Sequence, residues 1–247
     1  MSIKTPTSEP DLSLVIPCFN ECENVVLVLE RFAELCEDSP VNVELIFVDG
    51  GSSDGTLDAL KQKISELALL NVIVEQMQTK RGYGYDIMHG VGLARAPVIA
   101  WTHADMQTDL KDVFIGFDAY TASKHPETII KGHRQNRPLL DTAFTFGMQI
   151  VTLLLIKTNL NDINAQPKIF SRKFYENHLL SGAPDDFSLD LFLLYRAQKA
   201  GAKILTIPVV FADRKHGEAK GGGGSFQNKI KLVKRTFKYI WNLNRNV

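Results

Sequence analysis

Hydrophobic residues along the first part of the chain form two alternating patterns, short apolar runs and longer segments with helical spacing. An apolar run bounded by turn residues is typical of a buried strand, and apolar residues that recur every three or four positions indicate an amphipathic helix. In the segment 23–36, Val25, Leu29 and Phe32 share one helical face. The expected elements are strand 12–16, helix 23–36, strand 43–48, a helix that Asp54 caps and that reaches about residue 69, strand 72–75, helix 83–95 and strand 98–101.

Strands that alternate with helices of this length predict a parallel sheet, because parallel strands are joined by right-handed crossover connections. We therefore expect residues 12–108 to form a nucleotide-binding α/β half. Residues 109–220 are less regular and form the second half of the same domain. Their expected elements are strand 129–131, a long apolar helical segment 139–156, strand 165–170, helix 186–201 and strand 204–210.

Two terminal stretches lie outside this domain. Residues 1–11 are polar and contain proline, which predicts a loose tail. A glycine run opens residues 221–247, and a basic segment follows in which Ile230, Val233 and Phe237 recur at helical spacing. Such an apolar stripe beside basic residues suits an interfacial helix on an anionic membrane surface. The alternative is an amphipathic helix that packs on the domain and exposes a solvated basic face.

Composition narrows the class of protein. The chain has 247 residues, of which 45% are hydrophobic, and it carries 28 basic and 28 acidic residues, so one globular α/β domain with a substantial core is expected. The zero net charge gives no reason to expect nucleic acid as a partner. No apolar run is long enough for a transmembrane helix. Three cysteines and no secretory signal favour reduced thiols in a cytoplasmic compartment.

The segment His103–Gln107 is the most informative polar cluster, because it directly follows the apolar run 96–101. Ligands of open α/β sheets bind at the carboxyl ends of the strands. Asp105 and Gln107 are two residues apart, so both side chains can reach one hard cation that bridges a diphosphate. The alternative interpretation is a surface turn that happens to contain an aspartate.

Three further segments have the chemistry of a nucleotide site. Asp49 ends a strand, and its carboxylate can accept hydrogen bonds from a base or ribose, although acidic residues are also common in turns. The segment Pro17–Glu21 either lines a base pocket or caps a helix. In Lys80–Tyr85, two cations and two glycines at a helix start can approach a diphosphate, or they form a solvated basic turn.

Together these segments resemble the family 2 glycosyltransferases of the GT-A fold, and among them the dolichol- or polyprenyl-phosphate mannosyltransferase-like branch. The resemblance spans about residues 12–220 and implies a Rossmann-like, mostly parallel central sheet flanked by helices. Several motifs in the same order are more specific than any one of them. The matching segments are Val15–Glu21, Val48–Thr56, Arg81–Gly84, His103–Gln107, Lys131–Arg134 and Asp213–Glu218.

The resemblance also implies roles for individual residues. Asp105 and Gln107 would hold Mg²⁺ or Mn²⁺ on the diphosphate of the donor, where the ion stabilises the charge of the leaving group as a Lewis acid. Lys80 or Arg81 would supplement this stabilisation. The residues expected to bind the nucleotide sugar are Pro17, Asn20, Glu21, Asp49, Lys80, Arg81, Gly82, His103 and Asp105.

Two positions depart from the family pattern. The family usually has an acidic residue where this chain has His103, and often a second one where it has Gly50. Fewer carboxylates weaken the attraction for a hard cation, and a neutral imidazole suits Mn²⁺ better than Mg²⁺. His103 is either such a ligand or a hydrogen-bonding partner of the ribose or diphosphate, and we favour the second role.

The second half is expected to bind the acceptor, and the identity of its catalytic residues depends on the acceptor's chemistry. If the acceptor is a hydroxyl, Asp162 is the leading general base. Asp190 is the second candidate, or else a buried partner of a cation or a helix-capping acceptor. If it is a lipid phosphate, it is already anionic, and guanidinium groups that clamp its oxygens matter more. The residues expected to bind the acceptor are Arg134, Arg137, Arg214 and Lys215.

The chain is therefore expected to be a metal-dependent, inverting glycosyltransferase that moves a sugar from a nucleotide-diphosphate sugar to a polyprenyl phosphate. Asp162, Arg134 and Arg214 are its expected catalytic residues, and His216 and Glu218 could close over the donor as a lid. Transfer to a hydroxyl of a glycan or glycolipid is the alternative, and a non-catalytic nucleotide-sugar sensor is a third possibility. We expect a cytoplasmic protein with at most peripheral attachment to the membrane.

Overall fold

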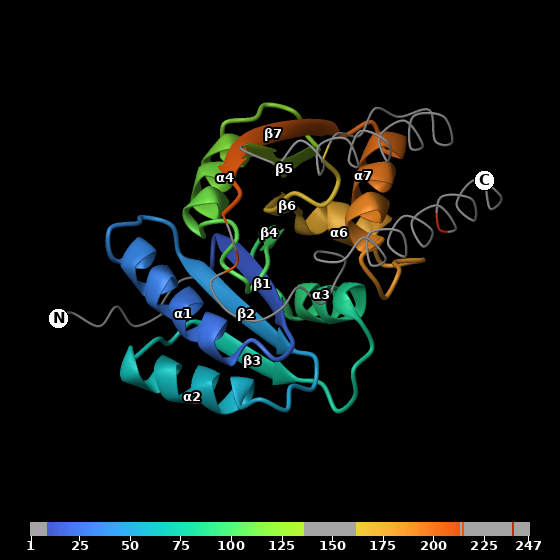
Figure 1. The fold of residues 1–247 in the computed structure, drawn as a ribbon. Coiled ribbons are helices and arrows are strands. Elements are labelled where there is room, and N and C mark those ends of the chain that lie inside the picture. Colours follow the sequence, from blue (N-terminus) through green and yellow to red (C-terminus); the bar gives the residue numbers. More distant parts are fainter. Residues whose placement is uncertain (1–8, 136–161, 213, 215–238, 240–247) are drawn as a thin grey trace.

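A single mixed sheet with helices on both faces organises the computed structural model, which describes residues 9–135, 162–212, 214 and 239 (Figure 1). The strands within these residues are β1 (Leu12–Cys18), β2 (Val43–Asp49), β3 (Val72–Gln76), β4 (Val98–Trp101), β5 (Thr128–Gln135), β6 (Lys168–Ser171) and β7 (Lys203–Val210). The helices are α1 (Cys22–Glu37), α2 (Thr56–Glu66), α3 (Tyr83–Leu93), α4 (Lys111–Thr121), α6 (Arg172–His178) and α7 (Leu189–Lys199).

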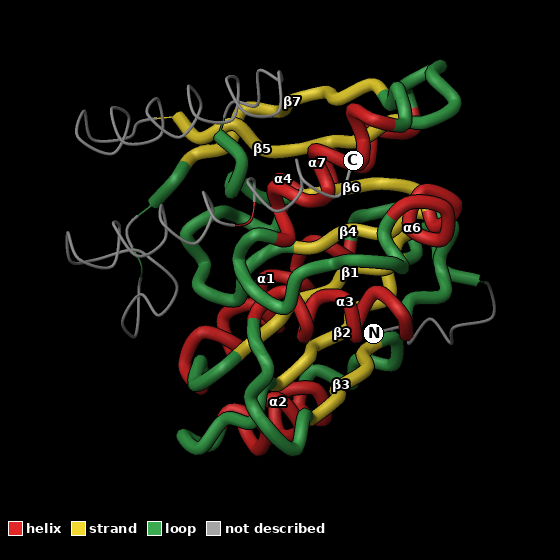
Figure 2. Tube along the Cα trace, turned by 90° about the vertical axis from the view of Figure 1, so that its right-hand side faces the viewer, coloured by secondary structure: helices red, strands yellow, loops and turns green. Residues whose placement is uncertain are grey.

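The strand order is β3-β2-β1-β4-β6-β5-β7, which Figure 2 shows from one edge of the sheet to the other. The strands β1, β2, β3 and β4 are mutually parallel, β7 is parallel to β5, and β6 runs antiparallel to both β4 and β5. The expected mostly parallel sheet is thus confirmed, with β6 as its one reversed strand in the described part of the chain. Because β1 lies between β2 and β4, the chain order changes direction there, and such a switch point opens a crevice at the carboxyl ends of the strands.

Two hydrophobic layers hold the helices to the sheet. Leu14 and Ile16 of β1 pack in a cluster with residues of α1, α2 and α4, whereas Val15 packs on the opposite face with residues of α3, α6 and α7. Every residue of β1 is buried, which is typical of a strand covered on both faces. The packed layers therefore fix the strand ends, and the loops that follow them start from rigid positions.

The predicted elements agree with the structure except in a few places. Asp54 is not the N-cap of α2: Gly55 holds that position, and the Asp54 carboxylate instead accepts the backbone N–H of Thr56 at 3.0 Å. No element was predicted for residues 111–121 and 172–178, which form α4 and α6. The predicted apolar helix 139–156 and nearly all of the basic tail lie outside the described residues.

No helix in the described ranges is both long and apolar enough to cross a membrane.

Candidate active site

The loops after β1 and β2 are fastened to each other at the carboxyl edge of the sheet. Asp49, the last residue of β2, is completely buried, and its Oδ1 accepts hydrogen bonds from the backbone N–H (3.0 Å) and Oγ (2.5 Å) of Ser52. The backbone N–H of Asn20 donates to Ser52 Oγ at 2.7 Å, and Asn20 Oδ1 accepts the N–H of Ser53 at 2.8 Å. Asn20 has a φ of 53°, a left-handed conformation that asparagine tolerates. Two of the residues expected to bind the nucleotide are therefore brought together.

An arginine from the end of the described chain joins the β1 loop to the β4 loop. Arg214 donates from Nη1 to Glu21 Oε1 at 3.0 Å and from Nη2 to Asp105 Oδ2 at 3.1 Å. All three side chains are largely buried. A charged pair in such a setting is screened less by solvent than a surface pair. Arg214 thus places a positive charge between two carboxylates at the switch point of the sheet.

Asp105 and Gln107 lie in one turn after β4, and their joint hold on a cation stays a prediction. The backbone N–H of Gln107 donates to Asp105 Oδ1 at 3.2 Å, and its side-chain amide donates to the carbonyl oxygen of Ala212 at 3.3 Å. The described residues contain no cluster of three or more histidine, cysteine or acidic side chains that would enclose a metal by itself. Oxygen donors from one or two carboxylates nevertheless fit Mg²⁺ or Mn²⁺, since such ions are commonly completed by phosphate oxygens of the substrate. Asp105 is the residue here that fits this role.

His103 lies in an aromatic stack. The ring of Tyr83 stacks on that of His103, with the ring centroids 5.3 Å apart. The same tyrosine ring also stacks on Phe187, with the centroids 4.3 Å apart and an interplanar angle of 8°. The stack joins the β4 loop to the start of α3 and to the segment before α7. His103 is therefore held by its ring face, which leaves its nitrogens at the ring edge for hydrogen bonds.

The basic segment before α3 is anchored by aromatic rings. Lys80 Nζ lies 3.6 Å from the ring centroid of Phe19, and the guanidinium of Arg81 lies 3.7 Å from that of Tyr85. Gly82 has a φ of 143°, and a side chain there would collide with the carbonyl oxygen of Asp185 at 2.3 Å. The glycine thus has a packing reason to be present, while its predicted contact with the donor stays a prediction.

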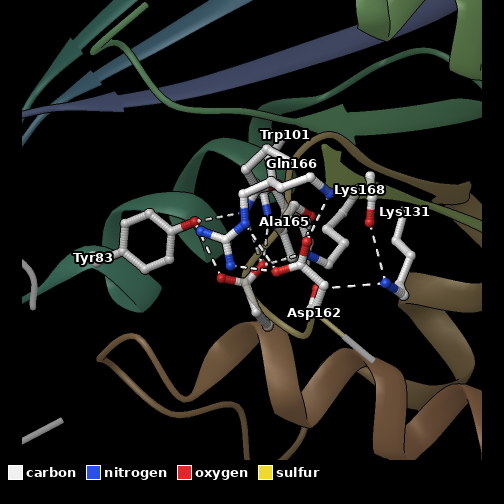
Figure 3. A network of polar contacts seen from close by, with 10 residues as sticks. Tyr83, Trp101, Lys131, Asp162, Ala165, Gln166 and Lys168 are labelled. Atoms are coloured by element: carbon white, nitrogen blue, oxygen red, sulfur yellow. Dashed lines mark hydrogen bonds and ion pairs between the residues drawn. The ribbon is translucent and has the colours of Figure 1, made fainter. Parts of the chain in front are cut away.

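A buried polar network connects this edge of the sheet to the core (Figure 3). Asp190 Oδ1 lies 3.0 Å from Lys168 Nζ and also accepts from Trp101 Nε1 at 3.2 Å and from Gln166 Nε2 at 3.0 Å. The hydroxyl of Tyr83 lies 3.4 Å from Asp190 Oδ2 and accepts from Gln166 at 3.2 Å. Burial lowers the pKa of Lys168, and Asp190 opposes that shift. Of the interpretations open for Asp190, the structure supports the buried partner of a cation.

The second carboxylate predicted in the acceptor half has a guanidinium partner. Asp162 is buried, its Oδ1 accepts from Nε of Arg134 at 2.8 Å and also from Nη2, and its Oδ2 accepts the backbone N–H of Arg134 at 2.7 Å. Lys131 is a neighbour of this pair: its Nζ donates to the backbone oxygens of Gly132 at 3.1 Å and of Asp162 at 3.4 Å. Burial, and then the nearby Lys168, lower the pKa of Lys131 to about 8.

Most of the predicted site residues that the structure describes lie at one edge of the sheet, after β1, β2, β4, β5 and β7. Arg137, Lys215, His216 and Glu218 lie outside the described residues. The sequence reasoning missed the contributions of Tyr83, Gln166 and Lys168. Lys168 offered a signal, since a lysine inside the apolar run 165–170 needs a buried partner. Tyr83 lies inside the segment Lys80–Tyr85 that was expected to approach the diphosphate, but no role was assigned to the side chain of Tyr83 or of Gln166.

Comparisons with known proteins identify the family. The sequence model of glycosyl transferase family 2 matches residues 13–175. The dodecaprenyl-phosphate galacturonate synthase of Rhizobium johnstonii is 37% identical over 108 residues, which make up 44% of this chain but only 32% of that protein. The polyprenol monophosphomannose synthase of Mycolicibacterium smegmatis is 26% identical over 230 residues, which cover 88% of this chain and 83% of that protein.

A solved structure shares the fold. Glucosyl-3-phosphoglycerate synthase from Mycobacterium tuberculosis, crystallised with Mn²⁺, UDP and glucosyl-3-phosphoglycerate, superposes with a TM-score of 0.71 at 13% sequence identity. The superposition covers 96% of this chain and 81% of that chain. The expected GT-A architecture is therefore confirmed for the sheet and its flanking helices. The chain belongs to glycosyl transferase family 2 and is a glycosyltransferase.

Proposed function

We propose that the chain is a metal-dependent, inverting glycosyltransferase that transfers a sugar from a nucleoside diphosphate sugar to a polyprenyl phosphate at the cytoplasmic face of a membrane. The observation that carries the choice of acceptor is the state of Asp162. Both of its carboxylate oxygens accept hydrogen bonds from Arg134. A carboxylate that accepts several charge-assisted hydrogen bonds is a weak proton acceptor. A phosphate acceptor needs no deprotonation, so this pair suits it better than it suits a hydroxyl.

Arg134 is then the residue that faces the acceptor, and Asp162 orients it. The contacts with Asp162 use Nε and Nη2, and a guanidinium carries further donors at Nη1. The ring of Phe211 lies 5.1 Å from the guanidinium carbon and limits its movement. An arginine held in this way loses little conformational entropy when it binds a phosphate oxygen. The names of two relatives, a dodecaprenyl-phosphate and a polyprenol monophosphate sugar synthase, support an acceptor of this class.

The donor is proposed to lie across the loops after β1, β2 and β4. When bound, a divalent cation would stabilise the negative charge of the departing nucleoside diphosphate. Asp105 would hold it, with Gln107 beside it, and the Mn²⁺ in the structurally similar synthase supports this assignment. Arg214 bridges Asp105 and Glu21, and it would bind the diphosphate as well. The acceptor oxygen would attack the anomeric carbon on the side opposite the leaving diphosphate, which inverts the configuration.

A comparison of two acceptors tests this proposal. Purified protein with Mn²⁺ is offered a panel of nucleotide sugars and either a short-chain polyprenyl phosphate or the matching polyprenol, and products are identified by mass spectrometry. We expect transfer to the phosphate only. Asp162→Asn should then keep most of its turnover, whereas Arg134→Ala should lose about a hundredfold or more, since charge-assisted contacts are worth 1.5–3 kcal/mol or more when buried.

The surface variant Arg31→Ala is a matched control, because Arg31 also pairs with an aspartate but lies on α1, outside the proposed acceptor site. Loss of a general base typically costs about a hundred- to ten-thousandfold. Loss of that size in Asp162→Asn, with normal turnover in Arg134→Ala and transfer to the polyprenol, would refute the phosphate acceptor.

A further inference from the structure

The carboxylate of Asp86 fills the space beside Gly50 that a side chain at position 50 would occupy. A Cβ atom built on Gly50 would lie 2.7 Å from Oδ2 of Asp86, closer than a Cβ can approach. Gly50 is not among the residues with a left-handed backbone, so its conformation itself would accept a side chain. The next contact, with the carbonyl oxygen of Cys18 at 3.6 Å, is ordinary. A side chain at position 50 would therefore have to displace the carboxylate of Asp86, which reaches this space from α3.

This arrangement places two buried carboxylates next to each other at the edge of the sheet. Asp49 is 0% and Asp86 is 5% exposed. Burial, and then the charge of Asp49, raise the pKa of Asp86 to about 6, while His89 and Lys80 oppose the shift and Asp185 adds to it. An acidic residue in the first turn of a helix also interacts favourably with the helix dipole, but that interaction does not require burial.

Each carboxylate has one oxygen without a partner among the described residues. Oδ2 of Asp49 and Oδ1 of Asp86 are buried and accept no hydrogen bond there. Leaving a buried acceptor unsatisfied costs free energy, and such groups are usually found where a ligand completes them. These two carboxylate oxygens carry negative charge, so a ligand group that binds them must donate an N–H or O–H, and a phosphate would be repelled.

The location of Asp49 and Asp86 indicates which part of a nucleoside diphosphate they would bind. Asp49 ends β2 and Asp105 follows β4, with β1 between them, so the two carboxylates belong to strands about 10 Å apart. Arg214 supplies positive charge at the Asp105 end, whereas the Asp49 and Asp86 end supplies acceptors. A nucleoside diphosphate has the matching polarity, with hydrogen-bond donors on its nucleoside and negative charge on its phosphates.

We propose that Asp86 is a nucleoside-binding residue of the donor site, where its carboxylate and that of Asp49 accept hydrogen bonds from the base or ribose of the donor. This inference rests on the proposed function, because it needs a nucleoside diphosphate as ligand. It also explains the departure at Gly50: a carboxylate reaches this space from α3 rather than from the loop after β2. The site is thus completed by a residue 36 positions further along the chain.

Calorimetric titration of the protein with UDP and GDP in the presence of Mn²⁺ tests the proposal. We expect Asp86→Ala to weaken binding of the preferred nucleotide about tenfold or more, the usual effect of losing a hydrogen bond to a charged group. The relocation variant, Gly50→Asp combined with Asp86→Ala, should restore affinity to within about threefold, because it returns a carboxylate to the same space. Gly50→Asp alone should bind poorly, since two carboxylates then collide.

Asp112→Asn is the matched control, because burial also raises the pKa of Asp112 to about 6 but this residue lies on α4. It should bind nucleotide as the unmodified protein does. If Asp86→Ala fails to fold, Asp86→Asn keeps the shape of the side chain and gives the same comparison. Titrations with the 2′-deoxy nucleotides show which group of the nucleoside donates the hydrogen bond to Asp86. If Asp86→Ala loses as much affinity for the deoxynucleotide as for the ribonucleotide, the base is the hydrogen-bond donor. If it loses less affinity for the deoxynucleotide, the 2′-hydroxyl of the ribose is the donor.

Two outcomes would overturn the inference, and they differ in what else they affect. Unchanged nucleotide affinity in folded Asp86→Ala would refute the role of Asp86 and leave the proposed function in place. Absence of binding of either nucleotide to the unmodified protein would refute the proposed function and this inference with it.

Discussion

The buried carboxyl of Asp86 should make the free energy of unfolding depend on pH, and this effect can be measured without a ligand. Its pKa lies at about 6 in the folded protein against 3.8 ordinarily, so the folded state retains a proton that the unfolded state releases. Below about pH 4 the group is protonated in both states and contributes no difference. Between about pH 4 and pH 6 the free energy of unfolding must fall as pH rises, and above pH 6 the full cost of the buried charge is present.

The size of this cost follows from the two pKa values, whose separation is worth about 3 kcal/mol. Asp86→Asn removes the titration and keeps the shape of the side chain. The free energy of unfolding of the variant minus that of the unmodified protein should therefore increase by about 3 kcal/mol between pH 4 and pH 7.5. That is a large part of the stability of an ordinary domain.

Urea unfolding at several pH values, followed by circular dichroism, measures this difference. Asp112→Asn should show a rise in the same direction, because the pKa of Asp112 is raised by the same main cause, burial. Comparing the two variants in the nucleotide titration then separates stability from binding: both should gain stability near neutral pH, and Asp86→Asn alone should lose affinity. A difference between Asp86→Asn and the unmodified protein that stays flat across this pH range would show that Asp86 is not buried beside Asp49 as the structure places it.

The remaining predictions concern the cation, the stack and the buried pair. Asp105→Asn should abolish Mn²⁺-dependent donor turnover with little change in melting temperature, and a fully active folded variant would rule out the metal assignment. His103→Asp should keep turnover and shift the preference toward Mg²⁺, because a carboxylate is a harder ligand than imidazole; complete loss of donor binding would point to a specific imidazole contact instead. Lys168→Met should lower the free energy of unfolding by about 3–5 kcal/mol, since it leaves Asp190 buried without its cation. A loss below about 1 kcal/mol in chemical denaturation would contradict that account.

The first half of the fold could be predicted from the sequence because each strand is a short apolar run between turns. Residues 12–18 and 43–49 are buried on both faces, and such strands leave a continuous hydrophobic signal. The loops after them could be assigned to a site, because parallel strands bring their carboxyl ends to one edge. The helix α4 was missed although Val113 and Phe117 are buried at helical spacing, since the turn residues around Asp109 obscured its start.

Contacts that join distant segments left no such signal. The position of Asp86 against Gly50 depends on how α3 docks on β1 and β2. The helical spacing of hydrophobic residues predicts that a helix packs on the sheet, but it does not predict where along the strands the helix lies. The same holds for Asp190, whose partners Trp101, Gln166 and Lys168 come from three places in the chain. Sequence reasoning assigns no role to Asp86 and names Asp190 without its partners; only the packed structure pairs these carboxylates with their neighbours.

The charges of the site are divided across the sheet in a way that fits the proposed order of the substrates. On the side of β2, Asp49 and Asp86 each have a buried oxygen that accepts no hydrogen bond within the described part of the chain. On the side of β5, the guanidinium of Arg134 is fixed by Asp162. Arg214 lies between the two sides, bound to carboxylates of the β1 and β4 loops. In the proposed arrangement, a donor with its nucleoside over these acceptors would bring its diphosphate toward Arg214, and its sugar would extend toward Arg134. An anionic acceptor drawn to Arg134 would approach from the side opposite the leaving group, which is the geometry that inversion requires.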